Sequence, residues 1–167
     1  YGRQSIDEND IQKVVEVLRS DRITQGPNVD KFEKILAEYC MAQHAVAVNS
    51  GTSALHISCL AAGIKEGDEV ITTPITFVAS ANCAVYCGAK PVFADIDKRT
   101  YNISPEEVEK KITEKTKAII PVHFAGQSCD MERIQGVVRS AEKKFGKKIY
   151  IIEDACHALG SLYKNTK

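Results

Sequence analysis

The chain has 167 residues, enough to bury one hydrophobic core, and its 22 basic residues are balanced by 22 acidic residues. This balance removes the electrostatic attraction by which proteins bind nucleic acids or anionic membranes. No apolar run approaches the roughly 18 residues that span a bilayer, and the first ten residues, YGRQSIDEND, lack the basic and apolar regions of a signal peptide. We therefore expect a cytoplasmic protein that binds neither nucleic acid nor membrane.

Six cysteines are scattered through apolar segments without a CxxC pair. This distribution favours reduced, mostly buried thiols over a disulfide framework. Cys83 and Cys87 have the spacing of one helix face, but no histidine or second cysteine pair accompanies them, so we expect no metal site.

The first 43 residues predict two amphipathic helices. Apolar side chains recur at i, i+3, i+4 and i+7 within residues 6–20, and Ser5 and Glu8 have the spacing of a capping box. A glycine–proline pair then interrupts the pattern. Its Pro27 suits the first turn of a second helix, which continues over residues 28–40.

From residue 44 the pattern changes to short apolar runs that alternate with helical segments. The runs predict strands at 45–49, 69–73, 91–96, 117–122 and 148–153. The intervening segments predict helices at 53–62, 77–87, 105–112 and 131–145, with Ser104 and Glu107 in capping-box spacing. Such alternation is typical of an α/β fold with three layers, α/β/α, around a mostly parallel sheet. We expect an N-terminal helical segment over 1–43 and a sheet-forming domain over 44–167.

The last predicted strand ends in two acids, Glu153 and Asp154. Ligands of open α/β sheets bind at the carboxyl ends of the strands, so an acid there is placed for chemistry. A carboxylate in this position can hold a cationic heterocyclic nitrogen, as pyridoxal phosphate (PLP) requires for its ring. The alternative is that Asp154 caps a following helix or turn.

The run Asn49-Ser-Gly-Thr-Ser-Ala-Leu55 follows the first predicted strand and opens a helix. Free backbone N–H groups and the positive end of the helix dipole, with the hydroxyls of Thr52 and Ser53, make this a candidate phosphate site. The run is neither a Walker loop nor a GxGxxG fingerprint. A plain strand-to-helix turn is the alternative interpretation.

The second predicted strand is stopped by Pro74, and Phe77 lies just beyond its carboxyl end. In a parallel sheet this end shares a rim with the phosphate site and Asp154. An aromatic ring there could stack on a flat cofactor. The alternative is that Phe77 is ordinary core at the start of a helix.

The segments NSGTSALH, TPITFVAS, ADID, PVHFAGQ and EDACHALGSLYK resemble the DegT-type sugar aminotransferases, which are PLP enzymes of fold type I. Within that family the sequence is most similar to transaminases that place an amino group on a UDP-linked 4-keto-6-deoxy amino sugar for pseudaminic acid. The resemblance runs through essentially the whole chain but covers only the first part of a family chain. It implies that the fold is part of the large domain of fold type I.

The resemblance also implies roles for single residues. Gly51 and Thr52 would bind the cofactor phosphate, Phe77 would stack on the pyridine ring, and Asp154 would pair with the ring nitrogen. His157 would lie near the ring hydroxyl, although a structural histidine is the alternative.

Two further segments match the family. Thr24, Gln25 and Gly26 correspond to an N-terminal segment that approaches the substrate. His123 corresponds to a strand-end position whose role is open, because a buried hydrogen-bonding role explains this histidine equally well.

The family's lysine that forms a Schiff base with PLP follows a Ser-x-His-x-x-Lys pattern downstream of EDACHALG. No such pattern occurs up to residue 167, and Lys164 and Lys167 correspond to a surface β-turn. We therefore expect the catalytic lysine and a small C-terminal domain beyond residue 167, so that this chain by itself is an inactive fragment.

For the intact enzyme the resemblance implies a homodimer that moves an amino group from glutamate to the UDP-sugar. Two alternatives remain open: a PLP-dependent sugar dehydratase, in which histidine replaces the lysine, and a truncated, non-catalytic protein that binds phosphate or a partner subunit. Because helices 6–20 and 28–40 would lack their family partners, we also expect exposed apolar surface and self-association.

Overall fold

The computed structural model describes residues 3–165, and the chain divides into two compact units, Tyr1–Ala47 and Val48–Lys167. The first unit contains α1 (Glu8–Leu18) and α2 (Pro27–Tyr39). Pro27 lies in the first turn of α2, as predicted, because a proline there sacrifices no helical hydrogen bond. No helix of the described residues is long and apolar enough to cross a membrane.

The cap of α1 differs from the prediction. Asp7, and not Ser5, precedes the helix and accepts hydrogen bonds from the amides of Asn9 and Asp10. The Asp10 side chain in turn accepts from the Asp7 amide, which closes the capping box. The predicted Ser5–Glu8 box was wrong because the helix begins two residues later than that box requires, and Asp7 and Asp10 form its capping box instead.

The predicted apolar surface of these helices is confirmed. No residue of α1 is buried, and Ala37 is the buried residue of α2. The exposed apolar side chains include Ile11, Val14, Leu18, Phe32 and Ile35.

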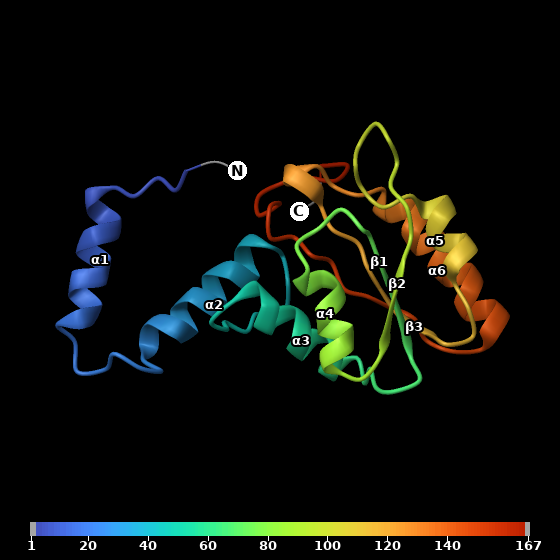
Figure 1. Ribbon diagram of the computed structural model, residues 1–167. Helices are drawn as coiled ribbons and strands as arrows, with labels where there is room; N and C mark the ends of the chain where they lie inside the picture. The colour runs from blue at the N-terminus through green and yellow to red at the C-terminus, as the bar shows by residue number, and fades with distance from the viewer. Residues whose placement is uncertain (1–2, 166–167) are drawn as a thin grey trace. The chain divides into compact units, whose positions relative to one another are not determined.

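The second unit is built around a four-stranded sheet. Its elements in chain order are α3 (Gly51–Ala61), β1 (Glu69–Thr72), α4 (Ala79–Tyr86), β2 (Lys90–Phe93), α5 (Pro105–Lys111), β3 (Thr116–Ile120), the short 3-10 helix η1 (Phe124–Gly126), α6 (Met131–Phe145) and β4 (Tyr150–Ile151). The strands are all parallel, in the order β2-β1-β3-β4. Helices α3 and α4 cover one face of the sheet, and α5 and α6 cover the other (Figure 1). This arrangement confirms the predicted α/β fold with a mostly parallel sheet.

Two cores result from the alternation of side chains along the strands. Ile71, Ile119 and Ile151 stand in register on neighbouring strands and pack with α5 and α6. Ala118 and Ile120 point the other way and pack with α3 and α4. Ile71, Ile119 and Ile120 are completely buried, and each contributes roughly 1.5–3 kcal/mol of burial free energy.

The predicted strand over residues 45–49 was wrong. These residues form no ladder with any described strand, and the Val46 side chain is 71% exposed. Apolar, β-branched residues favour an extended backbone, but a strand also needs a partner that satisfies its amides and carbonyls.

The remaining boundaries shift by a few residues. The predicted helix at 53–62 begins at Gly51, and the helix at 77–87 begins at Ala79, which leaves Phe77 outside it. The paired parts of the strands are shorter than predicted, and β4 is reduced to Tyr150–Ile151, although an isolated parallel bridge joins Val122 to Asp154.

Capping side chains set several of these boundaries. Ser104 caps α5 by accepting from the Glu107 amide, as predicted, but its own backbone amide donates to the Asp95 carbonyl, so no reciprocal bond with the Glu107 side chain forms. Asp130 caps the start of α6. Gly146 ends α6 at a φ of 66°, a left-handed conformation that glycine adopts without a steric penalty.

Candidate functional site at the carboxyl end of the sheet

Asp154 lies just beyond β4 and is held by the backbone of the neighbouring strand. Its amide donates to the Pro121 carbonyl at 2.9 Å, and its carbonyl accepts from the His123 amide at 3.1 Å. Side-chain alternation places Asp154 on the same face as Ile152, which packs with the α3 and α4 core. Asp154 is therefore positioned on this face of the sheet with only 6% of its surface exposed.

The Asp154 carboxylate accepts two hydrogen bonds. The Ser80 hydroxyl of α4 donates to Oδ2 at 2.7 Å, and the Cys156 amide donates to Oδ1 at 3.3 Å. Within residues 3–165, no lysine or arginine forms an ion pair with this carboxylate. Because an ionised carboxylate offers about four acceptor positions, it can still accept a further N–H, preferably from a cation. The alternative role of Asp154, as a cap of a following helix or turn, is observed for the turn, because Oδ1 accepts from the Cys156 amide where the turn begins, while no helix follows.

The predicted phosphate site lies at the N-terminus of α3. Gly51 is the first helical residue, and the Ser50 side chain caps the helix by accepting from the Ser53 amide at 3.2 Å. The Ser53 hydroxyl is engaged locally, because it donates to Asn49 Oδ1 at 2.7 Å. The first amides of a helix have no acceptor within it, so those of Gly51 and Thr52 can bind an anion with the help of the helix dipole.

Gly51 brings this helix end next to the Asp154 turn. A Cβ atom on Gly51 would lie 3.2 Å from the Sγ atom of Cys156, two residues after Asp154. The phosphate site and Asp154 therefore share one rim of the sheet, as predicted. Burial and the Asp154 carboxylate raise the pKa of the Cys156 thiol to about 11, so this thiol stays protonated and weakly nucleophilic near pH 7.

Phe77 lies in the segment before α4, with its side chain 72% exposed. It is therefore not ordinary core. Its carbonyl accepts from the Ser80 amide at 3.2 Å, so it lies one turn from the serine that binds Asp154. An exposed aromatic ring in this place is available to a ligand on the Asp154 face.

His157 is an exposed residue in the turn after Asp154. Its carbonyl oxygen packs against η1, since a Cβ atom on Gly126 would lie 3.3 Å from it. Its role near a cofactor ring stays a prediction.

His123 and Glu153 form a separate pair on the other face. The Cys129 amide donates to Nδ1 of His123 at 3.0 Å, so the proton of the neutral ring lies on Nε2, which donates to Glu153 at 2.9 Å. His123 is 6% exposed, and alternation places Glu153 with Ile151, on the α5 and α6 side. Both ring nitrogens of His123 are used, which favours the buried hydrogen-bonding role.

Thr24, Gln25 and Gly26 lie in the first unit, in the turn before α2. Thr24 and Gln25 are exposed, and Gln25 has a φ of 46°. Gly26 is the N-cap residue of α2. Contact of this turn with a substrate stays a prediction.

Ser80 is the site residue that the sequence interpretation missed. It is fully buried in the first turn of α4, and the Thr76 hydroxyl lies 2.8 Å from its Oγ. The available signal was a pair of hydroxyl residues at i and i+4 in an otherwise apolar segment, directly after a strand end.

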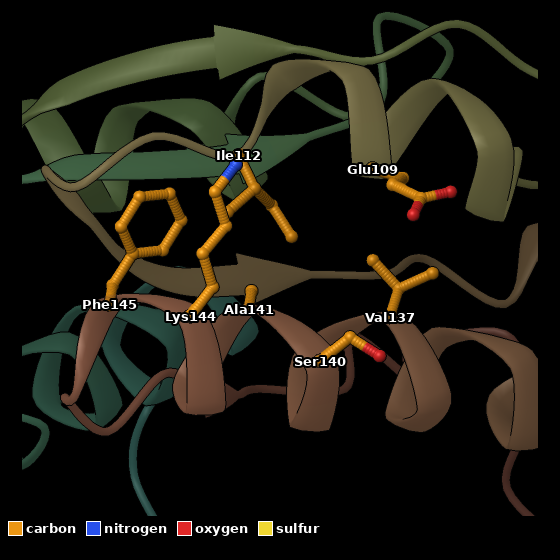
Figure 2. Close-up of a pocket in the computed structure, with 7 residues that line it drawn as sticks. All are labelled: Glu109, Ile112, Val137, Ser140, Ala141, Lys144 and Phe145. Carbon is orange, nitrogen blue, oxygen red and sulfur yellow. The ribbon is translucent and has the colours of Figure 1, made fainter.

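The pocket in Figure 2 lies between α5 and α6, on the face opposite Asp154. It has a volume of about 110 Å³, and its lining residues are Glu109, Ile112, Val137, Ser140, Ala141, Lys144 and Phe145. The lining combines apolar side chains with the polar groups of Glu109, Ser140 and Lys144, and the Lys144 ammonium lies 5.0 Å from the centre of the Phe145 ring. No residue of the Asp154 site lines this pocket. Within residues 3–165, no three His, Cys, Asp or Glu side chains gather as a metal site would require.

Comparison with solved structures supports this geometry. The PLP form of a sugar aminotransferase, Spr1654 from Streptococcus pneumoniae, superposes with a TM-score of 0.90 at 38% identity, over 97% of this chain and 44% of that one. Helicobacter pylori PseC, an aminotransferase involved in pseudaminic acid biosynthesis, superposes with a TM-score of 0.86 at 39% identity, over 98% and 43% of the two chains.

Three curated relatives are similar in sequence. The spore coat polysaccharide biosynthesis protein SpsC of Bacillus subtilis is 47% identical over 98% of this chain and 41% of its own length. GDP-perosamine synthase of Caulobacter vibrioides is 44% identical over 97% and 42%. The UDP-4-amino-4-deoxy-L-arabinose–oxoglutarate aminotransferase of Shewanella sediminis is 45% identical over 97% and 40%. The chain thus spans about two fifths of the length of the relatives that it matches.

The family model for the DegT/DnrJ/EryC1/StrS aminotransferases matches residues 4–167, which is nearly the whole chain. This match, together with the sequence identities and the parallel sheet, shows that the chain belongs to the DegT/DnrJ/EryC1/StrS aminotransferase family.

Proposed function

We propose that this chain forms the cofactor-binding part of a longer, PLP-dependent sugar aminotransferase. The observation that carries the proposal is Asp154, a buried carboxylate with spare acceptor capacity, beside the free N-terminus of α3. A phosphate site and a carboxylate for a ring nitrogen are two of the demands that PLP makes of a protein, besides a lysine.

The residues of the site fit this cofactor. The amides of Gly51 and Thr52 bind the phosphate, with the Thr52 hydroxyl as a further donor. The exposed ring of Phe77 would cover the cofactor, His157 would lie near its hydroxyl, and the buried Asp154 would accept the N–H of its ring nitrogen. When bound, PLP supplies an electron sink for the carbanion that forms at the amino-bearing carbon of the substrate. Asp154 maintains that sink by keeping the ring nitrogen protonated.

The lysine that bonds to the cofactor belongs, in this proposal, to the part of the protein beyond residue 167. Lys164 forms an ion pair with Glu132 of α6, on the face of the sheet opposite Asp154. Lys167 lies outside the described residues. The chain by itself would then be inactive.

We propose a UDP-linked 4-keto-6-deoxy amino sugar as amino acceptor and glutamate as donor. The support for the acceptor is the similarity to PseC, and the support for the donor is the oxoglutarate in the name of the Shewanella relative. The turn Thr24–Gly26 would approach this sugar nucleotide. The intact enzyme would be a cytoplasmic homodimer, as the family resemblance implies.

The test is a transamination assay with the full-length protein, PLP and glutamate. A UDP-linked and a GDP-linked 4-keto-6-deoxy sugar are compared, and both 2-oxoglutarate and the sugar product are quantified. We expect stoichiometric 2-oxoglutarate and an amine at C4 of the UDP-sugar, with lower kcat/KM for the GDP-sugar. Activity on the GDP-sugar alone would refute the proposed acceptor. Loss of a hydroxyl group without amination would indicate a dehydratase, and no reaction with either sugar would refute the aminotransferase proposal.

A further inference from the structure

A row of three polar side chains leads from the segment before α4 to Asp154, the proposed partner of the cofactor ring nitrogen. Thr76 Oγ1 lies 2.8 Å from Ser80 Oγ, and Ser80 Oγ lies 2.7 Å from Asp154 Oδ2. Ser80 is completely buried and Asp154 is 6% exposed, so bulk water does not compete for the second bond.

The direction of these bonds follows from the chemistry of the groups. An ionised carboxylate only accepts, so the single hydroxyl proton of Ser80 points to Asp154. The Ser80 oxygen must then accept the proton of Thr76. The row therefore runs Thr76 to Ser80 to Asp154, and each donor polarises the next.

The position of the Asp154 backbone does not depend on this row. The Pro121 carbonyl and the His123 amide already bond its main chain. What Ser80 determines is the rotation of the carboxylate, because a short donor on Oδ2 holds that oxygen in place.

We propose that Ser80 is a positioning residue for the pyridinium partner Asp154, and that Thr76 acts through Ser80. This inference rests on the proposed PLP function of the site. With Ser80 in place, Oδ2 is held and the carboxylate stays ionised while it accepts the ring N–H. Without Ser80, the ionised carboxylate loses a donor, and the proton that it shares with the ring nitrogen shifts towards the carboxylate.

The experiment measures the ring nitrogen directly in the full-length protein reconstituted with PLP labelled with ¹⁵N in the ring. The ¹⁵N chemical shift reports the protonation of that nitrogen, and fluorescence titration gives the PLP dissociation constant. In Ser80→Ala we expect the shift to move towards unprotonated pyridine and PLP affinity to fall about tenfold, the usual effect of one hydrogen bond to a charged group.

Matched variants separate this role from a structural one. Ser58→Ala removes a helix hydroxyl of α3 that donates to the Ala54 carbonyl, and it should leave the ¹⁵N shift unchanged. Thr76→Val should move the shift in the same direction as Ser80→Ala but less far, and Thr76→Ser should restore it. If Ser80→Ala does not fold, the difference in ¹⁵N shift between Thr76→Val and Thr76→Ser tests the proposal instead.

The outcomes distinguish the proposed PLP function from the positioning role of Ser80. A wild-type protein that does not bind PLP, or that holds an unprotonated ring, overturns the proposed function. A wild-type protein with a protonated ring whose Ser80 and Thr76 variants give the same shift overturns the positioning role alone.

Discussion

Glu153 and Asp154 are neighbours in the chain but belong to opposite faces of the sheet. Asp154 lies on the α3 and α4 face, where it meets Ser80 and the N-terminus of α3. Glu153 lies on the α5 and α6 face, where it accepts from His123. Two neighbouring acids thus acquire different hydrogen-bond partners, because a strand presents successive side chains to opposite faces.

The largest effect should separate these two acids. In the full-length enzyme, Asp154→Ala should lower kcat by at least about a hundredfold, since the charge that holds the ring proton is lost. Glu153→Gln keeps an acceptor for His123 and should retain most of the activity. Both rates are measured by 2-oxoglutarate release in the coupled glutamate assay. Retained activity in Asp154→Ala would refute the assignment of Asp154.

The second effect concerns stability on the Glu153 face. His123→Ala leaves the Cys129 amide without its buried acceptor and should lower the free energy of unfolding by about 2 kcal/mol. His123→Asn keeps an acceptor near the position of Nδ1 and should recover about half of that loss. Denaturant unfolding gives these values, and PLP affinity measured in parallel should be unchanged. A tenfold loss of PLP affinity in a folded His123 variant would instead assign His123 to the site.

The smallest effect is a pH dependence on the same face. Burial, together with the negative charge of Glu153, raises the pKa of the Cys129 thiol from 9.0 to about 12. The unfolded chain therefore loses this proton before the folded chain does, so stability falls as pH rises above about 9. Relative to Cys129→Ser, the wild-type protein should lose up to about 1 kcal/mol between pH 8.5 and 9.5. Parallel stability curves for the two proteins over this interval would contradict the raised pKa.

Much of the fold and the site could be predicted because the signals are local. The apolar stripe of α6, the proline that opens α2 and the small-residue run that opens α3 act within a few residues of themselves. The segments around Gly51, Phe77 and Asp154 also carry the family resemblance, and the family match over residues 4–167 confirms it.

Other features depend on a choice between competing local residues or on residues that are distant in the chain. The cap of α1 depended on a choice between Ser5 and Asp7, which compete for the same amides. The run at 45–49 has the composition of a strand but no ladder partner among the described strands. The Ser80–Asp154 bond joins residues 74 positions apart.

By itself, then, the sequence determined the α/β alternation, the small-residue run that opens α3 and the presence of an acid after the last strand. Only the tertiary structure decided which hydroxyl bonds to Asp154 and that both ring nitrogens of His123 are used on the other face. The physical reason is that periodicity and capping act over single turns, whereas pairing and side-chain contacts depend on how strands and helices are packed.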